Sequence, residues 1–503
     1  MLITDKYAKD IHGLLSCYDR VVVFATPGGF GYSGGMTNFF YQHELKIFDF
    51  HNVFEPVTQA IKDNAARIAK DNGLKIEYIK KTGAFRKEDR IKGILEKRGE
   101  HEGLVHIFSA MEVSDTYSPW HDKEEGKTHF KPDTTKCLHY YFYFIDRDLG
   151  LCFFRLPTIA PFKASIYFNG HDLLAGKLKK REIAYEKADN AFTFIADFDE
   201  AQRLADSIRV EDLHAAFDIF ASRYLPLPEE WHLKMNYTIR QVEYATDIVF
   251  RDANALKPLY DNIIRTAMHT VTPEDVASFL GKKFSVRFEG EMGSRYNKRI
   301  LGTRIKHQMG EVSVKIYDKF GSVLRIEVTS NDVSQFKVFR EVPKRDGTTV
   351  SKVANAKKSI YSLYPLIQVF KNATRRYLEF ISAFDDPTEG LKKLDKVTEP
   401  VKVNDRTYKG FNFFDREDGM ILQTIADGRF TLKGMGNREL RKLLPGKTAG
   451  QISRIFKRLR LHGLIKKVGK TYRYYVTALG RQVIVAGLGF KNMTLVPQLS
   501  VQH

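Results

Sequence analysis

Histidines and carboxylates between residues 106 and 146 are the first side chains whose chemistry could define a site. A divalent cation that assists phosphodiester cleavage needs two or more convergent carboxylates, often with a histidine. Glu112 follows a strand expected over 104–111, and Asp146 follows one expected over 139–145, so the two could hold Mg²⁺. The spacing matches no metal motif, and polar loops are rich in the same residue types. The whole group is His106, Glu112, Asp115, His121, Asp122, His129, His139 and Asp146.

A second group of charged residues lies between residues 315 and 327. Residues 299–329 predict three consecutive strands, with Gly310 and Gly321 at the turns. Glu327 is a third candidate for a catalytic or metal-binding carboxylate, and Lys315 and Arg325 could contact phosphates. Cross-strand charge pairing on a solvated sheet face is the interpretation that the sequence favours.

The order Tyr317-Asp318-Lys319, a turn, and then Leu324-Arg325-Ile326-Glu327 resembles the end of the replication-initiation domain in some phage and plasmid initiator proteins. The resemblance covers about thirty residues. It implies a nuclease that nicks DNA with a tyrosine beside a metal held by a His-x-His pair. The chain departs from that pattern because it contains no His-x-His.

Two further patterns bear on binding. The glycine-rich stretch 26–35 (TPGGFGYSGG) has neither GxxxxGK[ST] nor GxGxxG, so it predicts a flexible turn and no nucleotide site. The aromatic run 140–144 faces Phe153, Phe154 and Arg155 in an expected hairpin. Exposed rings beside an arginine could stack unpaired bases, and core packing is the alternative.

The last hundred residues carry the clearest structural pattern. Helices are expected over 416–427, 437–444 and 448–462, followed by a hairpin from 465–468 and 472–476 and a helix over 478–486. In the third helix Ile452, Ile455, Phe456 and Leu459 form one apolar stripe. This order of helices and hairpin is that of a winged helix.

The segments Leu461-His462-Gly463-Leu464-Ile465 and Tyr475-Val476-Thr477-Ala478-Leu479-Gly480 resemble MarR-like winged-helix regulators. The resemblance covers about 80 residues and implies that the third helix and the wing contact DNA. Basic and polar side chains on these two elements are the candidate nucleic-acid contacts. They are Lys447, Gln451, Arg454, Lys457, Arg458, Lys466, Lys467, Lys470 and Arg473.

Charge and composition favour a nucleic-acid partner. The formal net charge is +19, and residues 401–503 hold 20 Lys and Arg against 6 Asp and Glu, a net +14. Such a surface attracts phosphate by releasing counterions. Three separated cysteines without a CxxC pair argue against a disulfide framework or a zinc ribbon. No apolar run of membrane-spanning length or signal peptide is visible, so a cytoplasmic protein without a membrane partner is expected.

These observations predict an α+β multidomain chain. The expected parts are a mixed α/β domain over 1–225, a central domain of a β-meander plus helices over 226–385, a linker over 386–410 and a winged-helix domain over 411–503. We expect a nucleic-acid-binding protein of a bacterium or mobile element, with DNA favoured, RNA open and a homodimer open. The alternatives are a transcription regulator with a ligand- or partner-sensing N-terminal region, and a metal-dependent nuclease or replication initiator.

Overall fold

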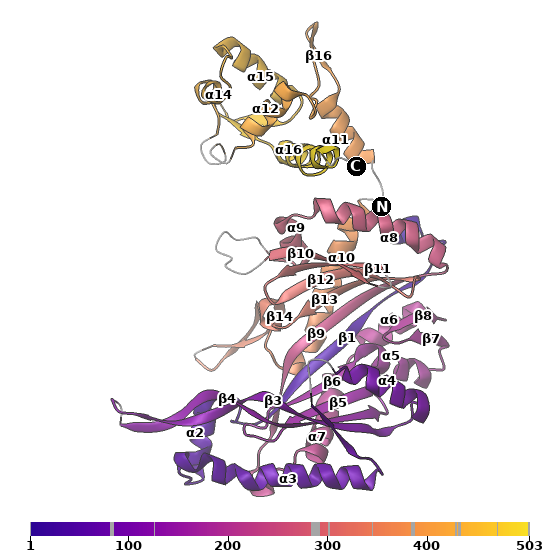
Figure 1. The fold of residues 1–503 in the computed structure, drawn as a ribbon, viewed down its shortest axis with the longest axis vertical. Helices are drawn as coiled ribbons and strands as arrows, with labels where there is room; N and C mark the ends of the chain where they lie inside the picture. The colour runs from indigo at the N-terminus through magenta and orange to yellow at the C-terminus, as the bar shows by residue number, and fades with distance from the viewer. Residues whose placement is uncertain are drawn as a thin grey trace. The chain divides into compact units, whose positions relative to one another are not determined.

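The chain forms two compact units, residues 1–382 (unit 1) and 383–503 (unit 2), in the computed structural model (Figure 1). The structure describes residues 2–80, 85–124, 126–282, 292–299, 302–344, 346–383, 388–427, 430, 434–469 and 471–500. The architecture is mixed α/β, as the sequence predicts. Within the described residues, no helix is both long and apolar enough to cross a membrane.

An eleven-stranded sheet forms the centre of unit 1, in the order β10-β11-β12-β13-β9-β1-β6-β5-β4-β3-β2. All described pairings are antiparallel except that of β2 with β3. The strands are β1 (Ile11–Pro27), β2 (Ile76–Ile79), β3 (Gly103–Asp122), β4 (Lys127–Asp146), β5 (Gly150–Pro157), β6 (Ala164–Asn169), β9 (Met235–Phe250), β10 (Met292–Arg299), β11 (Gly302–Met309), β12 (Val312–Lys319) and β13 (Val323–Ser330).

The two domains expected over 1–225 and 226–385 share this one sheet. Strand β9 pairs along its whole length with β1, and β13 pairs with the other edge of β9. The chain therefore does not divide near residue 225, but only after residue 382. The predicted meander over 299–329 is confirmed as β11, β12 and β13, with Gly310 and Gly321 in the left-handed region at φ 57° and 75°.

Long helices cover one face of the sheet. Phe142 on β4 stacks on Tyr224 of α7 (Val210–Tyr224), with ring centroids 4.4 Å apart, and α3 (Phe50–Asp71) packs beside it. Farther along, Tyr18 and Tyr244 contact Phe370 of α10 (Leu363–Ser382). Near β11 and β13 lie α8 (Ala253–Thr270) and α9 (Pro273–Phe279), whereas α2 (Ser33–Gln42) contacts β4.

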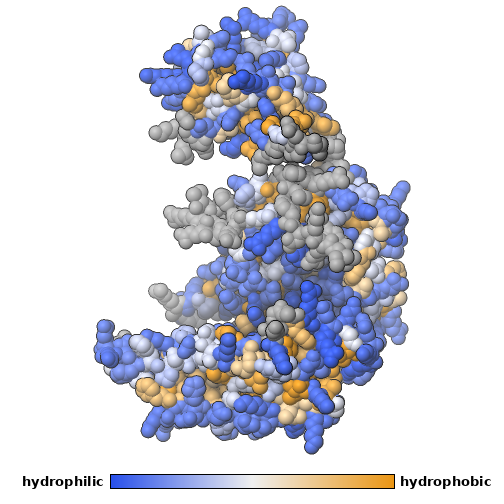
Figure 2. Space-filling model, in the orientation of Figure 1, coloured by the Kyte–Doolittle hydropathy of each residue, from blue (hydrophilic) through white to orange (hydrophobic). Residues whose placement is uncertain are grey.

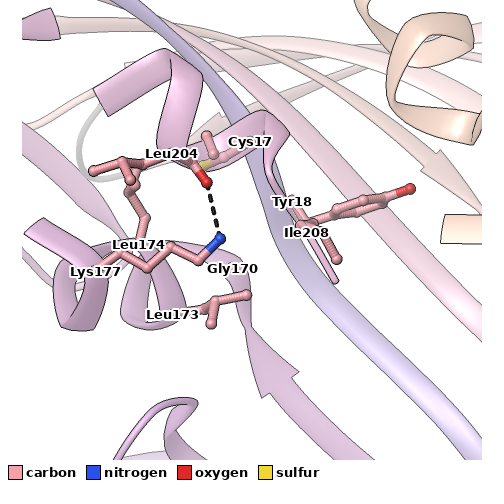
Figure 3. Close-up of a pocket in the computed structure, with 9 residues that line it drawn as sticks. Cys17, Tyr18, Gly170, Leu173, Leu174, Lys177, Leu204 and Ile208 are labelled. Carbon is pink, nitrogen blue, oxygen red and sulfur yellow. Dashed lines mark hydrogen bonds between the residues drawn. The ribbon is translucent and has the colours of Figure 1, made fainter. Parts of the chain in front are cut away.

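The opposite face is covered in two separate places. One cover is helix α4 (Lys87–Arg98), which packs over Tyr141 and Tyr143. The other cover packs over Leu15 and Cys17 and consists of α5 (Gly170–Lys180), α6 (Phe198–Asp206) and the hairpin β7–β8 (Tyr185–Ala188, Ala191–Ile195). The void beneath α5 is about 10 Å³, room for one water at most, and Lys177 Nζ donates to Leu204 O beside it at 2.9 Å (Figure 3). Between these two covers the sheet surface is polar and partly exposed, and we call it the open face.

Two β-bulges decide which side chains reach the open face. One extra residue on β1 lies between the pairs Tyr18↔Tyr244 and Val21↔Val242, and one on β9 lies between Val22↔Gln241 and Val23↔Ile239. An extra residue breaks the strict alternation of side chains. The bulges are the reason why Asp19 and Arg20, which are adjacent in sequence, both contribute to the open face.

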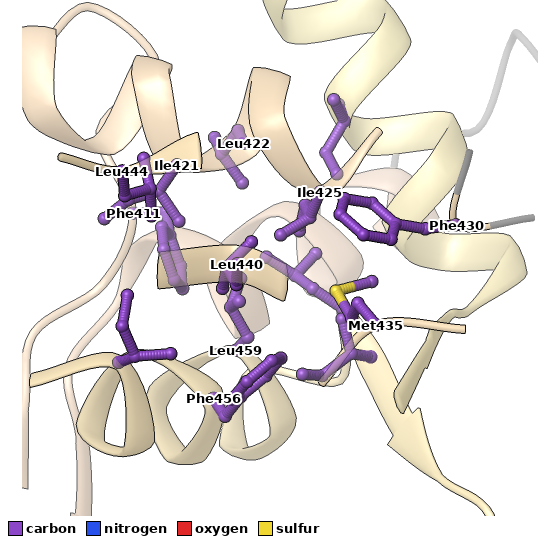
Figure 4. Close-up of a cluster of buried hydrophobic side chains, with 14 of the residues drawn as sticks. Phe411, Ile421, Leu422, Ile425, Phe430, Met435, Leu440, Leu444, Phe456 and Leu459 are labelled. Carbon is purple, nitrogen blue, oxygen red and sulfur yellow. The ribbon is translucent and has the colours of Figure 1, made fainter. Parts of the chain in front are cut away.

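Unit 2 packs helices around its own core. The helices are α11 (Thr388–Thr398), α12 (Arg416–Ile425), α14 (Asn437–Leu443), α15 (Ala449–Leu461) and α16 (Ala478–Gly489), and the short hairpins are β16–β17 (Val401–Val403, Arg406–Tyr408) and β18–β19 (Ile465–Lys467, Tyr474–Val476). Ile452, Phe456 and Leu459 of the predicted stripe are buried together with Phe411 and Leu422 (Figure 4). Thr448 caps α15 through a reciprocal box with Gln451.

Two expectations about loops are wrong. The polar segment that holds Trp120, His121 and His129, after the strand expected over 104–111, is not a loop: it continues β3 and β4 as one long hairpin, in which Trp120 pairs with His129. The expected linker 386–410 contains α11 and the hairpin β16–β17, and Val397 of α11 is buried in the core of unit 2. Polar composition led to both errors, because solvent-facing strands and helices share that composition with loops.

We predict that Phe142→Ala strongly destabilises unit 1. The ring is fully buried against Tyr224, and removing such a side chain leaves a cavity that costs about 3–5 kcal/mol. Urea denaturation monitored by circular dichroism measures the loss. The control is Ile219→Ala on α7, where the side chain is 56% exposed and a change within about 0.5 kcal/mol is expected. Equal effects of the two substitutions would contradict the packing described for α7.

Candidate nucleic-acid interface and the buried charge network

A buried guanidinium lies at the centre of unit 1. Arg325 on β13 is fully buried and forms a two-pronged ion pair with Asp247 on β9, both N–O distances being 2.6 Å. It also donates to Asp19 on β1 at 3.3 Å and to the Asn190 carbonyl at 2.6 Å. One side chain therefore ties three strands to the β7–β8 hairpin.

The imidazole of His171 completes this network. Gly170 permits α5 to approach β1, because a Cβ there would lie 2.0 Å from the Tyr18 carbonyl oxygen. Nη2 of Arg325 lies 3.1 Å from His171 Nε2, and since a guanidinium can only donate, a hydrogen bond there requires Nε2 to accept. Nδ1 faces Asp19 Oδ1 at 3.2 Å.

Burial and charge act in opposite directions on the two aspartates. Burial by itself would raise the pKa of Asp247, but the Arg325 charge and hydrogen bonds outweigh it and lower the pKa to about 2. The pKa of Asp19 is lowered too, with burial again opposed by Arg325 and His171. Asn169 and Asn190 also donate to Asp19, so its oxygens are well supplied with donors.

Next to this network, Glu327 is bound by its neighbours on β12. Lys315 Nζ lies 2.5 Å from one carboxylate oxygen, and the Tyr317 hydroxyl donates to the other at 2.6 Å. Lys315 also reaches Glu243 at 3.3 Å. Burial would lower the pKa of Lys315, but Glu327 and Glu243 raise it, so the ammonium stays charged.

These contacts correct two predictions at once. Arg325 is inaccessible to phosphate, and Lys315 is already paired with two carboxylates. The expected cross-strand charge pairing is present, because Lys315 and Glu327 are direct partners in the register, as are Arg325 and Asp247. The expectation of a solvated sheet face is wrong, because Arg325, Glu327 and Asp247 are buried. Oxygens of Asp19, Glu243 and Glu327 lie within 4.8 Å of one another, and Lys315 supplies positive charge at that place.

The predicted metal pair is not brought together. Glu112 lies opposite Cys137 on β4, nine residues before Asp146, which corresponds to about 30 Å of extended strand. Glu112 accepts from Arg155 at 2.8 Å and from Tyr141, whereas Asp146 accepts from backbone amides in the β4–β5 turn. Both carboxylates have structural partners, and neither is near Glu327, which lies on β13.

The aromatic run 140–144 is also not a binding surface. All five rings are buried, with Phe142 and Phe144 against α7 and Tyr141 and Tyr143 under α4. Both faces of β4 are covered there, because helices lie on each side of the sheet. The alternative of core packing is therefore the correct one for this segment.

In unit 2, a basic groove runs between the hairpin β16–β17 and helix α15. It has a volume of about 720 Å³, and no carboxylate lines it. The buried imidazole of His462 holds both ends of the segment that contains the hairpin β16–β17. Its Nδ1 and Nε2 lie 2.8 and 3.1 Å from the carbonyl oxygens of Lys396 and Lys409. The lining residues are Arg406, Thr407, Tyr408, Lys409, Ser453, Arg454, Ile455, Lys457 and Arg458.

The predicted contacts of α15 divide into available and engaged side chains. Arg454 is exposed, and Lys457 lies over the Tyr408 ring at 5.2 Å with its charge toward the groove. Arg458, in contrast, forms a two-pronged pair with Asp418 at 2.6 and 2.7 Å and lies 3.8 Å above Phe411. Burial would raise the pKa of Asp418, but the Arg458 hydrogen bonds lower it. Arg458 is therefore a structural residue, which corrects its assignment.

The remaining predicted contacts have partners or are exposed. Lys447 pairs with Glu417, Gln451 caps the first turn of α15, and Arg473 pairs with Glu439 at 2.7 Å. Lys466 and Lys467 are exposed on β18, and Lys470 lies outside the described residues. Sequence reasoning missed Arg406 and Lys409, which lie in the segment expected to be a linker. The available signal was a short hairpin pattern, Val401-Lys402-Val403 and Arg406-Thr407-Tyr408 separated by the two turn residues Asn404 and Asp405.

No family model, curated protein or solved structure matches this chain.

We predict that Arg325→Met reverses the direction in which the stability of unit 1 changes as the pH falls. In the wild type the pKa of Asp247 is lower in the folded than in the unfolded chain. Its contribution to the free energy of unfolding is therefore complete above about pH 4 and is lost as the pH falls toward 2. Without Arg325, two buried carboxylates lose their counter-charge, which costs about 3–5 kcal/mol at pH 7. Burial then raises their pKa, and the variant gains stability as the pH falls from 7 toward 5. Urea midpoints at pH 7, 6 and 5 measure this, and parallel profiles for variant and wild type would refute it.

We also predict that Arg458→Ala destabilises unit 2, whereas Arg454→Ala leaves its stability almost unchanged. Arg458→Ala leaves the nearly buried Asp418 unpaired and should destabilise unit 2 by about 3–5 kcal/mol. Arg454→Ala removes an exposed side chain and should change stability by less than about 0.5 kcal/mol. Thermal unfolding of both variants decides the matter. Equal melting temperatures would mean that the Arg458–Asp418 pair does not hold α15 to α12.

Proposed function

We propose that this chain binds duplex nucleic acid through unit 2, which acts as a winged-helix domain, and that DNA is the favoured ligand. The observation that carries the proposal is the basic groove between β16–β17 and α15. Five of its nine lining residues are Lys or Arg, and none is acidic. A duplex backbone binds such a surface by releasing condensed counterions.

The element order of unit 2 supports the winged-helix assignment. Helices α12, α14 and α15 are followed by the hairpin β18–β19 and by α16, and Met435 adds a bridge to Tyr474 beside the hairpin. In such domains the third helix approaches the duplex and the hairpin contacts its backbone. Lys466 and Lys467, exposed on β18, suit that second role.

The engaged side chains refine the proposed interface. Arg454 and Lys457 present charge from α15, and Arg406 and Lys409 present it from the opposite wall. Arg458 positions the hairpin, because it donates to the carbonyl oxygens of Lys409 and Gly410 at 2.9 and 2.5 Å. The hairpin β16–β17 thus widens the contact that α15 alone would offer.

We predict that Arg454→Ala combined with Lys457→Ala weakens duplex binding at least tenfold at low salt. Two lost phosphate contacts should also reduce the slope of log K against log salt by about 1.8. Fluorescence anisotropy with a labelled 20-base-pair duplex over a KCl series gives both quantities. EDTA should leave the affinity unchanged, because cationic side chains and not a bound metal make the contacts.

The matched control removes the same charge elsewhere in unit 2. Lys392 and Lys393 are exposed on α11 and do not line the groove. Alanine at both positions should lower affinity by less than threefold. If the control and the groove variant lose affinity equally, net charge rather than the groove determines binding. If neither changes, unit 2 is not the duplex-binding unit.

A further inference from the structure

The open face of unit 1 holds two arginines without an anionic partner. Among the described residues, neither Arg20 on β1 nor Arg240 on β9 has an ion-paired or hydrogen-bonded guanidinium, and Arg20 Nε is shielded from solvent without an acceptor. One extra residue on each strand, at the two β-bulges, sets where these side chains lie. Bulges are frequent next to functional sites because they redirect side chains.

Aromatic rings support the cations on this face. Arg20 lies over the Tyr167 ring at 5.2 Å, and Lys163 and Arg240 lie over Phe24 at 4.1 and 5.2 Å. Tyr167 stacks in turn on Phe153, with centroids 5.1 Å apart and planes within 10°. Rings and cations therefore alternate across four neighbouring strands, β9, β1, β6 and β5.

Two cations on this face have carboxylate partners, since Arg155 pairs with Glu112 at 2.8 Å and Lys163 with Asp115 at 3.0 Å, whereas Arg20 and Arg240 have none among the described residues. Burial lowers the pKa of Arg240, and the nearby Arg155 and Arg20 charges lower it further. The carboxylates of the network are already paired with Arg325 and Lys315. Hydrophilic side chains also predominate over the middle of unit 1 (Figure 2). Like charges crowded on a half-buried surface are relieved when an anion binds.

We propose that this surface, comprising Arg20, Phe24, Tyr167 and Arg240, binds a short stretch of single-stranded nucleic acid. Phosphates contact Arg20 and Arg240. Unpaired bases stack on the two guanidinium planes, because cations and Phe153 already cover the faces of Phe24 and Tyr167. The four strands span about 14 Å, which suits a few nucleotides of an extended strand. Guanidinium planes that lie over aromatic rings favour a single strand, because a duplex keeps its bases stacked inside. The proposal rests on unit 1 alone and does not depend on the proposed function of unit 2.

The test is binding of labelled dT12 by the full chain, followed by anisotropy over a KCl series. The proteins are Arg454→Ala/Lys457→Ala as the background, and the same background with Arg20→Gln and Arg240→Gln. We expect the added substitutions to weaken dT12 binding at least tenfold and to reduce the salt slope by about 1.4, since two contacts to a single strand are lost. Duplex binding by an otherwise wild-type chain with Arg20→Gln/Arg240→Gln should change less than threefold.

The matched control is Arg67→Gln with Arg375→Gln, two exposed arginines on the outer surfaces of α3 and α10. It should bind dT12 as its parent does. Unchanged dT12 affinity in a folded Arg20→Gln/Arg240→Gln protein, or an equal loss in the control, would overturn the proposal. If glutamine at these sites prevents folding, Arg20→Lys/Arg240→Lys keeps the charges and must retain binding.

Ultraviolet crosslinking of the wild-type chain to dT12 gives an independent result. Crosslinked peptides from β1, β6 or β9 support the proposal, whereas crosslinks confined to unit 2 exclude it. Failure of the duplex experiments with unit 2 would leave these outcomes unaffected, so the two proposals can fail separately.

Discussion

The burial of Arg325 is the constraint on which unit 1 depends. A guanidinium removed from water is tolerated only when carboxylates and carbonyl oxygens satisfy its donors, and here Asp247, Asp19 and Asn190 do so. Because these partners come from β9, β1 and the β7–β8 hairpin, the halves of the sheet and their cover cannot shift independently. The same demand explains Gly170, which lets α5 come close enough for His171 to join the network.

Charge is used differently in the two units. In the centre of unit 1, carboxylates and cations meet pairwise, and the unmatched arginines stay at the edge of the open face. In unit 2, cations greatly outnumber acids, and one of the few acids, Asp418, is used to fix Arg458 under the hairpin β16–β17. The contrast between Arg454 and Arg458, one helical turn apart on α15, shows that position on a helix face alone does not separate an exposed side chain from one held in an ion pair.

The sequence predicted elements well where a local period was strong. The meander of β11, β12 and β13 and the helices α12, α14, α15 and α16 lie within a few residues of their expected bounds, because turn glycines and an apolar stripe act over short distances. The candidate metal carboxylates were placed poorly. Glu112 and Asp146 each follow a strand expected from the sequence, but the long β3–β4 hairpin holds them far apart. The local sequence gives no signal of how long those strands are.

By itself the sequence determined the mixed α/β character, the concentration of positive charge after residue 401 and the apolar faces that each element must bury. Only the tertiary structure decided that residues 11–27 and 235–250 pair within one sheet and that Arg325 is buried rather than exposed. It also decided that β-bulges place Asp19, Arg20 and Arg240 on the open face of that sheet. The physical reason is that propensity and periodicity are local properties of the chain. Register, bulge position and the pairing of buried charges are settled between separate segments, 78 residues apart for Arg325 and Asp247 and 306 for Arg325 and Asp19, where the cost of an unpaired charge selects the arrangement.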